Sequence, residues 1–185
     1  YNSVEGDIWE GIMVEHDGTG SVFKGNVINT LEATVGLAVG EGGSLLFTDN
    51  TITTDGTAIQ LPSGSNLIIT NNTIISAGVS IYGTGIDSAQ VTGNTCDDIP
   101  NNSPDDYWAI EMDECDDCTF AENTVNYLAG NAIKSNSSEN SSFTGNVLNV
   151  NRKGIEADSG DSLEVANNNV TGFKEYGIRF NSTSR

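Results

Sequence analysis

One short motif recurs along the whole chain: an apolar residue, two variable residues and then an asparagine. The asparagines that end the motif are spaced by 22 to 24 residues, except for one interval of 29. Asn2 fits as a truncated first copy, and seven complete copies end at Asn26, Asn50, Asn72, Asn94, Asn123, Asn146 and Asn168. A fixed period of this length is typical of a solenoid, in which each repeat packs on the next.

Two further columns keep the same period. The residue two places after each asparagine is apolar, except that one copy has cysteine: Val4, Ile28, Ile52, Ile74, Cys96, Val125, Leu148 and Val170. A small residue followed by an aliphatic one also occurs once per repeat: Gly11-Ile12, Gly36-Leu37, Ala58-Ile59, Gly78-Val79, Ala109-Ile110, Ala132-Ile133, Gly154-Ile155 and Gly177-Ile178. Apolar residues alternate around these columns and no helical period appears, so each repeat is predicted to hold three short strands.

The columns predict an all-β fold, a parallel β-helix of three sheets and about eight coils, formed by residues 1–185 as a single domain. Each strand would pair with its copy about 4.8 Å away, which gives a rod roughly 38 Å long. Leucine-rich repeats have a similar length, but their Leu-rich consensus is absent. We expect the asparagines to take the left-handed bend between two strands, and their amides to hydrogen-bond from coil to coil.

The repeats resemble those of right-handed parallel β-helix proteins, the pectate-lyase-like group with its asparagine ladder, over essentially the whole chain. The resemblance implies that the ladder lies at the tight turn between the second and third sheets. It also implies that the first sheet is the one that bears the active site in the lyases. It does not imply one activity, because this fold hosts lyases, hydrolases, epimerases, adhesins and phage fibres.

Charged residues gather on the expected face of the first sheet. The residue after each aliphatic one should point outward, as should the residue two places further on. This rule places Ser80 and Tyr82 outward in the fourth coil. For the last four coils it places outward Glu111 and Asp113, Lys134 and Asn136, Glu156 and Asp158, and Arg179 and Asn181. The long insertion at residues 97–107 enters the sheet beside Glu111.

Two interpretations of this face stay open. By the resemblance, four carboxylates would supply the hard oxygen ligands that Ca²⁺ prefers: Glu111, Asp113, Glu156 and Asp158. Lys134 or Arg179 would then act as the catalytic base next to a uronate carboxylate, provided that a nearby cation lowers its pKa. Alternatively, the four residues that follow the aliphatic positions form an alternating charge ladder that only stabilises the sheet.

The cysteines and the acidic turn give weaker signals. Cys96 lies in an apolar column and is predicted to be a buried thiol. Cys115 and Cys118 form a single CxxC, which is weak evidence for zinc and leaves a local disulfide open. The acidic run around them, residues 113–117, lacks the spacing of an EF-hand and favours a solvated turn.

The composition limits the partners. Seven Lys and Arg against 26 Asp and Glu leave a net charge of −19, which disfavours nucleic acids and anionic membranes. The chain has no apolar run of about 18 residues, so no membrane insertion is expected. Such an acidic, lysine-poor surface suits high salt or a calcium-rich exterior, with an ordinary soluble acidic protein as the alternative.

These observations favour a non-catalytic extracellular or cell-surface module with a structural, fibre-forming or adhesive role. It would require no cofactor, and a polysaccharide is its candidate ligand. No capping element appears in the sequence, so we expect either head-to-tail self-association through the coil edges or a longer parent chain. The alternative is a calcium-dependent lyase of acidic glycans, in which calcium bridges the acidic chain and its substrate.

Overall fold

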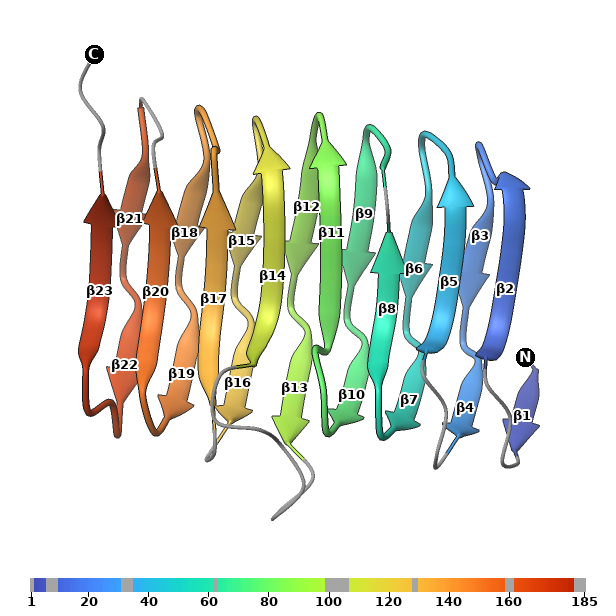
Figure 1. Cartoon of the computed structure of the whole chain (residues 1–185), viewed down its shortest axis with the longest axis horizontal. Coiled ribbons are helices and arrows are strands. Elements are labelled where there is room, and N and C mark those ends of the chain that lie inside the picture. The colour runs from blue at the N-terminus through green and yellow to red at the C-terminus, as the bar shows by residue number, and fades with distance from the viewer. Residues whose placement is uncertain are drawn as a thin grey trace.

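The computed structural model describes residues 2–5, 10–30, 35–61, 63–98, 107–127, 130–158 and 162–181, with the backbone alone at residues 10, 15–17 and 41. In these ranges the chain forms 23 strands. The strands build three parallel sheets that run along a rod, with β1 at one end and β23 at the other (Figure 1). None of the described residues belongs to a helix that could cross a membrane.

Each coil supplies one strand to each sheet, except that the described residues of the last coil include no strand of sheet C. Strands of neighbouring coils pair in parallel. Sheet A contains β1 (Ser3–Glu5), β4 (Val27–Thr30), β7 (Thr51–Thr54), β10 (Thr73–Ser76), β13 (Thr95–Asp98), β16 (Thr124–Tyr127), β19 (Val147–Val150) and β22 (Asn169–Thr171). Sheet B contains β2 (Glu10–Asp17), β5 (Val35–Glu41), β8 (Thr57–Leu61), β11 (Ile81–Ile86), β14 (Trp108–Cys115), β17 (Asn131–Asn136), β20 (Lys153–Asp158) and β23 (Tyr176–Asn181). Sheet C contains β3 (Val22–Lys24), β6 (Leu46–Thr48), β9 (Leu67–Thr70), β12 (Ala89–Thr92), β15 (Thr119–Ala121), β18 (Ser142–Thr144) and β21 (Glu164–Ala166). The predicted three-sheet parallel solenoid is thereby confirmed.

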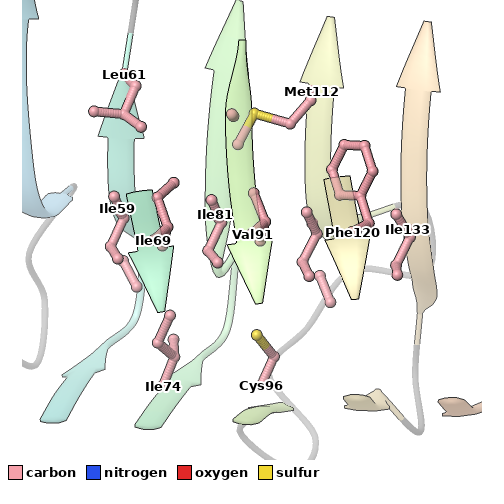
Figure 2. Close-up of a cluster of buried hydrophobic side chains, with 14 of the residues drawn as sticks. Ile59, Leu61, Ile69, Ile74, Ile81, Val91, Cys96, Met112, Phe120 and Ile133 are labelled. Atoms are coloured by element: carbon pink, nitrogen blue, oxygen red, sulfur yellow. The ribbon is translucent and has the colours of Figure 1, made fainter. Parts of the chain in front are cut away.

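The interior is filled by in-register columns of buried side chains. Figure 2 shows three members of the sheet B column on successive or nearby coils, Ile59, Ile81 and Ile133. Two pairs of phenyl rings from sheet C stack inside with nearly parallel planes: Phe23 on Phe47 at 4.8 Å, and Phe120 on Phe143 at 4.9 Å between ring centroids. Stacking of this kind adds about 0.5–1.5 kcal/mol per pair to the burial of the rings.

The predicted asparagines stack at the corner where sheet C passes into sheet A. Asn72 shows the pattern: its Nδ2 donates to Asn94 Oδ1 at 2.9 Å and to Phe47 O at 3.0 Å. Its Oδ1 accepts from Nδ2 and from the backbone N of Asn50, at 2.8 and 3.0 Å. The same hydrogen bond between side-chain amides of neighbouring coils links all seven asparagines, and Asn2 extends the column. This column, the asparagine ladder, is confirmed.

The left-handed bend at this corner was wrongly assigned to the ladder asparagines. It falls on the preceding residue, where φ lies between 56° and 66°: Gly25, Asp49, Asn71, Gly93, Glu122, Gly145 and Asn167. Since each ladder amide must point into the corner in line with its copies, the sharp change of backbone direction falls one residue earlier. Gly, Asn and Asp, which tolerate positive φ, fill every one of these positions except Glu122.

The fourth coil of sheet B corrects a second expectation. Ile81, and not Val79, pairs with Ile59 on one side and Ile110 on the other. The outward residue is therefore Tyr82, while Ser80 is buried and its hydroxyl lies 3.0 Å from the Tyr127 hydroxyl. The small-aliphatic pair of this coil is Ser80-Ile81, and the Gly78-Val79 assignment was shifted by two residues because it followed the residue types rather than the 22-residue spacing from Ile59.

Candidate functional site

The outward face of sheet B holds the residues singled out in the sequence. One row, in register from coil to coil, runs along the rod through Met13, Ala38, Gln60, Tyr82, Glu111, Lys134, Glu156 and Arg179. A second row, two residues further along each strand, runs through Thr84, Asp113, Asn136, Asp158 and Asn181. We call the last four members of the first row the charge ladder. Its strands are β14, β17, β20 and β23, which are neighbours in Figure 1.

The charge ladder pairs its members in twos. Lys134 Nζ lies 2.7 Å from Glu111 Oε1, and both side chains are about one-fifth exposed. Arg179 pairs with Glu156 Oε1, and the Tyr176 hydroxyl donates to Glu156 Oε2. Opposite charges on adjacent strands attract, so each pair ties two coils together.

These contacts set the ionisation of the ladder. Burial alone would raise the pKa of Glu156, but the hydrogen bonds from Tyr176 and Arg179 outweigh it and lower that pKa below its usual value. For Lys134, burial would lower the pKa, but the hydrogen bond to Glu111 and the neighbouring carboxylates raise it. Lys134 is therefore a protonated amine at neutral pH. A catalytic base at this position would need a lowered pKa, whereas the contacts of Lys134 leave its pKa raised.

The four candidate calcium ligands do not converge. Glu111 and Glu156 stand two strands apart, on the order of 10 Å, with Lys134 between them. The Asp113 carboxylate accepts from Asn136 Nδ2 at 2.6 Å. In the described ranges no three His, Cys, Asp or Glu side chains form a metal-binding group. A calcium site on this face stays a prediction.

The second row repeats its pairing in the last two coils. Asp158 Oδ1 accepts from Asn181 Nδ2 at 2.5 Å, as Asp113 does from Asn136. Asn136 Oδ1 is buried and has no hydrogen-bond partner. Among the described residues of this row, Asn136 Oδ1 is thus the one buried oxygen without a partner, and it lies between two coils whose carboxylates are already engaged.

A cation–aromatic cluster borders the charge ladder, and the sequence reasoning missed it. Lys153 Nζ lies 5.6 Å from the ring centre of Trp108 and 5.9 Å from that of Tyr176. The Arg179 guanidinium lies 4.3 Å from the same Tyr176 ring. Contacts of this kind contribute about 0.5–2 kcal/mol each. The available signal was the clustering of basic residues, because six of the seven Lys and Arg fall at residue 134 or later.

The cysteines take two different states. Cys96 is a free, fully buried thiol, as predicted, and burial raises its pKa to about 12. Cys115 and Cys118 form a disulfide with both sulfur-bearing residues buried, which settles the alternatives left open for the CxxC. The intervening residues Asp116 and Asp117 are exposed. Residues 99–106 of the long insertion lie outside the described residues.

The comparison with known proteins supports the fold and leaves the activity open. Residues 10–170 match the family described as "Right handed beta helix region". No curated protein matches the chain, and no solved structure matches it. The matched stretch includes the seven ladder asparagines, three of the four residues of the charge ladder and most of the three sheets. The chain therefore belongs to the right-handed β-helix family.

Proposed function

We propose that the chain is a non-catalytic extracellular or cell-surface module, a rigid rod whose faces serve adhesion and contact with glycans. The observation that carries this proposal is the pairing on sheet B. Lys134 is held by Glu111 and Arg179 by Glu156, so the face that could carry catalysis has its charges engaged within the protein. A lyase would need one of these bases to be neutral and free.

The disulfide between Cys115 and Cys118 supports the proposed extracellular or cell-surface location. Disulfides persist in oxidising surroundings outside the cytosol and are rare in the reducing cytosol. The Cys115–Cys118 bridge is buried at the corner between sheets B and C, where Cys115 is in register with the core residue Ile86 of the preceding coil. This placement suits a chain that folds and works in an oxidising compartment.

A largely uncharged face supports contact with glycans. On sheet A, six outward positions in register are β-branched: Val27, Thr51, Thr73, Thr95, Thr124 and Val147. The chain as a whole has a charge of −19, so a flat face of hydroxyl and methyl groups is where a neutral polymer meets the least repulsion.

The experiment combines turnover with retention. The purified chain is incubated with polygalacturonate or alginate and millimolar calcium, and unsaturated products are followed by absorbance. In parallel its retention on insoluble neutral polysaccharides is measured. We expect retention without turnover. Turnover that Lys134→Gln abolishes and Lys24→Gln leaves intact would contradict the proposal and establish the lyase alternative.

We also propose that copies stack end to end. Within the described ranges, β1 and β2 at one end of the rod and β22 and β23 at the other are paired on one side only. The last coil also exposes Ile178 and Phe180. Association should increase with salt, which screens the repulsion between acidic copies. Light scattering that shows a monomer at every protein and salt concentration would contradict stacking.

A further inference from the structure

A hollow of about 290 Å³ lies on the outer face of sheet C, across β9, β12 and β15. Its floor is formed by three outward residues that are in register, Ile68, Gln90 and Thr119. Its rim is formed by the turn residues before these strands, Asn66, Ser88 and Asp117. The volume is at the lower end of the range of about 300–1,000 Å³ for ligand pockets, so it suits one small ring rather than an oligomer.

Two hydrogen-bonding groups in the hollow have no partner among the described residues of the protein. Some outward side chains on the other sheets do bond to a neighbouring coil, as Asn126 Nδ2 does to Asp97 Oδ1 at 2.8 Å and Asn136 does to Asp113. In the part of the chain that the structure describes, neither the Gln90 amide nor the Asp117 carboxylate has a hydrogen-bond or ion-pair partner. Both groups therefore remain available to a ligand.

The backbone that carries Asp117 is held in place. Its φ is 52°, its N–H donates to Glu139 O at 2.9 Å, and the Cys115–Cys118 disulfide spans it. In the two preceding coils of the same rim, Ser88 Oγ donates to Asn66 Oδ1 at 3.3 Å and accepts from the Asn66 N–H at 3.0 Å. A carboxylate on a fixed turn loses little conformational freedom on binding, which favours a preformed site.

The chemistry of the lining selects the ligand. Neighbouring hydroxyls of a sugar can donate to Asp117 and both donate to and accept from Gln90, while a C–H face of the ring packs on Ile68, which is 38 % exposed. A metal ion fits poorly, because Ca²⁺ takes about 6–8 oxygen ligands and Asp117 is the only carboxylate of the lining. An acidic sugar would be repelled by Asp117 and by the net charge of −19.

We infer that the sheet C hollow binds a single neutral pyranose unit of a glycan. This inference rests on the proposed function and adds to the uncharged face of sheet A a specific site on sheet C, away from the charge ladder. The test follows backbone amide shifts by NMR while methyl glucoside, methyl mannoside and methyl galactoside are added up to about 20 mM, the range for weak single-ring binding. Methyl galacturonoside is the acidic comparison.

At least one neutral glycoside should saturate and shift the amides of Gln90 and Thr119, and the galacturonoside should not. The double variant Asp117→Asn with Gln90→Ala should weaken binding at least tenfold, since both free groups are lost. The matched control is Asp49→Asn with Gln60→Ala: Asp49 has the same left-handed backbone at φ 57°, at a different corner, and Gln60 lies on sheet B. The affinity of this control variant for the neutral glycoside should stay within twofold of that of the parent chain.

Three outcomes would overturn the inference: no saturable shift with any neutral glycoside, equal weakening by both double variants, or shifts confined to sheet B. The retention of the whole chain on insoluble polysaccharide is measured separately with the same variants. If the parent chain and the double variant of Asp117 and Gln90 are retained equally, the hollow is not the glycan-binding site, and the proposed function still holds. A parent chain that is not retained would count against the proposed function, whatever the glycoside result.

Discussion

The asparagine ladder and the charge ladder run along the same rod with the same coil-to-coil spacing, but they are built on different rules. An amide both donates and accepts, so every internal member of the asparagine ladder matches an identical neighbour on either side. A charge attracts only its opposite, so the charge ladder separates into the pairs Glu111–Lys134 and Glu156–Arg179. Burial adds to the difference, because the central ladder asparagines are at most 1 % exposed while Arg179 is nearly half exposed.

The comparison teaches that self-complementary groups can continue along a solenoid without limit, whereas ion pairs form separate units. Unpaired polar groups in the interior cost far more than those at the surface. The asparagine ladder should therefore dominate the stability of the fold, and the charge ladder should modify it. Four measurements on variants test this contrast.

The largest loss is expected for Asn123→Ala. The change removes the acceptor for Asn94 Nδ2 and for its backbone N–H, the side-chain donor to Val91 O, and one of the two donors to Asn146 Oδ1, at a cost of about 1–3 kcal/mol in unfolding free energy. Denaturant unfolding measures it. Asn149→Ala, at an exposed position of sheet A, is the control and should change stability by less than about 0.5 kcal/mol. Equal losses of stability in the two variants would contradict the claim that the asparagine ladder dominates the stability of the fold.

The next effect is expected for Glu156→Gln, the most buried member of the charge ladder. The loss of its charged hydrogen bonds with Tyr176 and Arg179 should cost about 1–2 kcal/mol at neutral pH. The folded pKa of Glu156 is lowered, so its stabilisation is full above the ordinary pKa of about 4.3 and fades as the pH falls through the folded value. The gap between parent and variant should therefore close in acid, while exposed Glu164→Gln shows no such gap. A gap that persists unchanged at low pH would contradict this account.

A smaller gain is expected for Glu122→Gly. Glu122 holds φ at 56°, which costs an L-residue about 1–2 kcal/mol, while glycine brings back an entropic cost of about 0.5–1 kcal/mol. The net effect should be stabilisation of about 0.5–1 kcal/mol, measured as a raised midpoint of unfolding. Glu164→Gly, within strand β21, should be destabilising instead. Destabilisation in both variants would show that the Glu122 side chain contributes more than its backbone costs.

The smallest effect is expected for Lys134→Gln. Partly exposed ion pairs contribute little, so the loss should be about 0.5 kcal/mol and should shrink with added salt. Lys24→Gln, which breaks a looser and more exposed pair with Asp49 at 3.8 Å, should have no measurable effect. A loss at Lys134 as large as that at Asn123 would remove the contrast between the two ladders.

The regular parts of the fold could be predicted from the sequence because each is read from a column of like residues. The asparagine ladder, the three sheets and the outward positions of Glu111, Lys134, Glu156 and Arg179 follow from spacing alone. The errors came where residue type was preferred to spacing, as at Val79 in place of Ile81. Spacing cannot show which polar atoms lack a partner.

The sheet C hollow was missed for that last reason. Gln90 and Asp117 belong to different coils and occupy positions that the repeat treats as variable. Their importance depends on having no bond to a neighbouring coil, which only coordinates reveal. The disulfide between Cys115 and Cys118 was likewise undecidable, because a CxxC specifies no geometry.

The hydrogen bond from Asn94 to Asn123 has a consequence for the length of the loops. These two asparagines are 29 residues apart, yet the hydrogen bond between their side-chain amides, at 3.1 Å, is nearly as short as the one between asparagines 22 residues apart. The hydrogen bonds at this corner thus restore the register of the chain after a preceding turn of either length. Segments inserted where sheet A leads into sheet B can therefore vary in length and composition without disturbing the stacked coils, which makes this edge of the rod a natural position for grafting new loops.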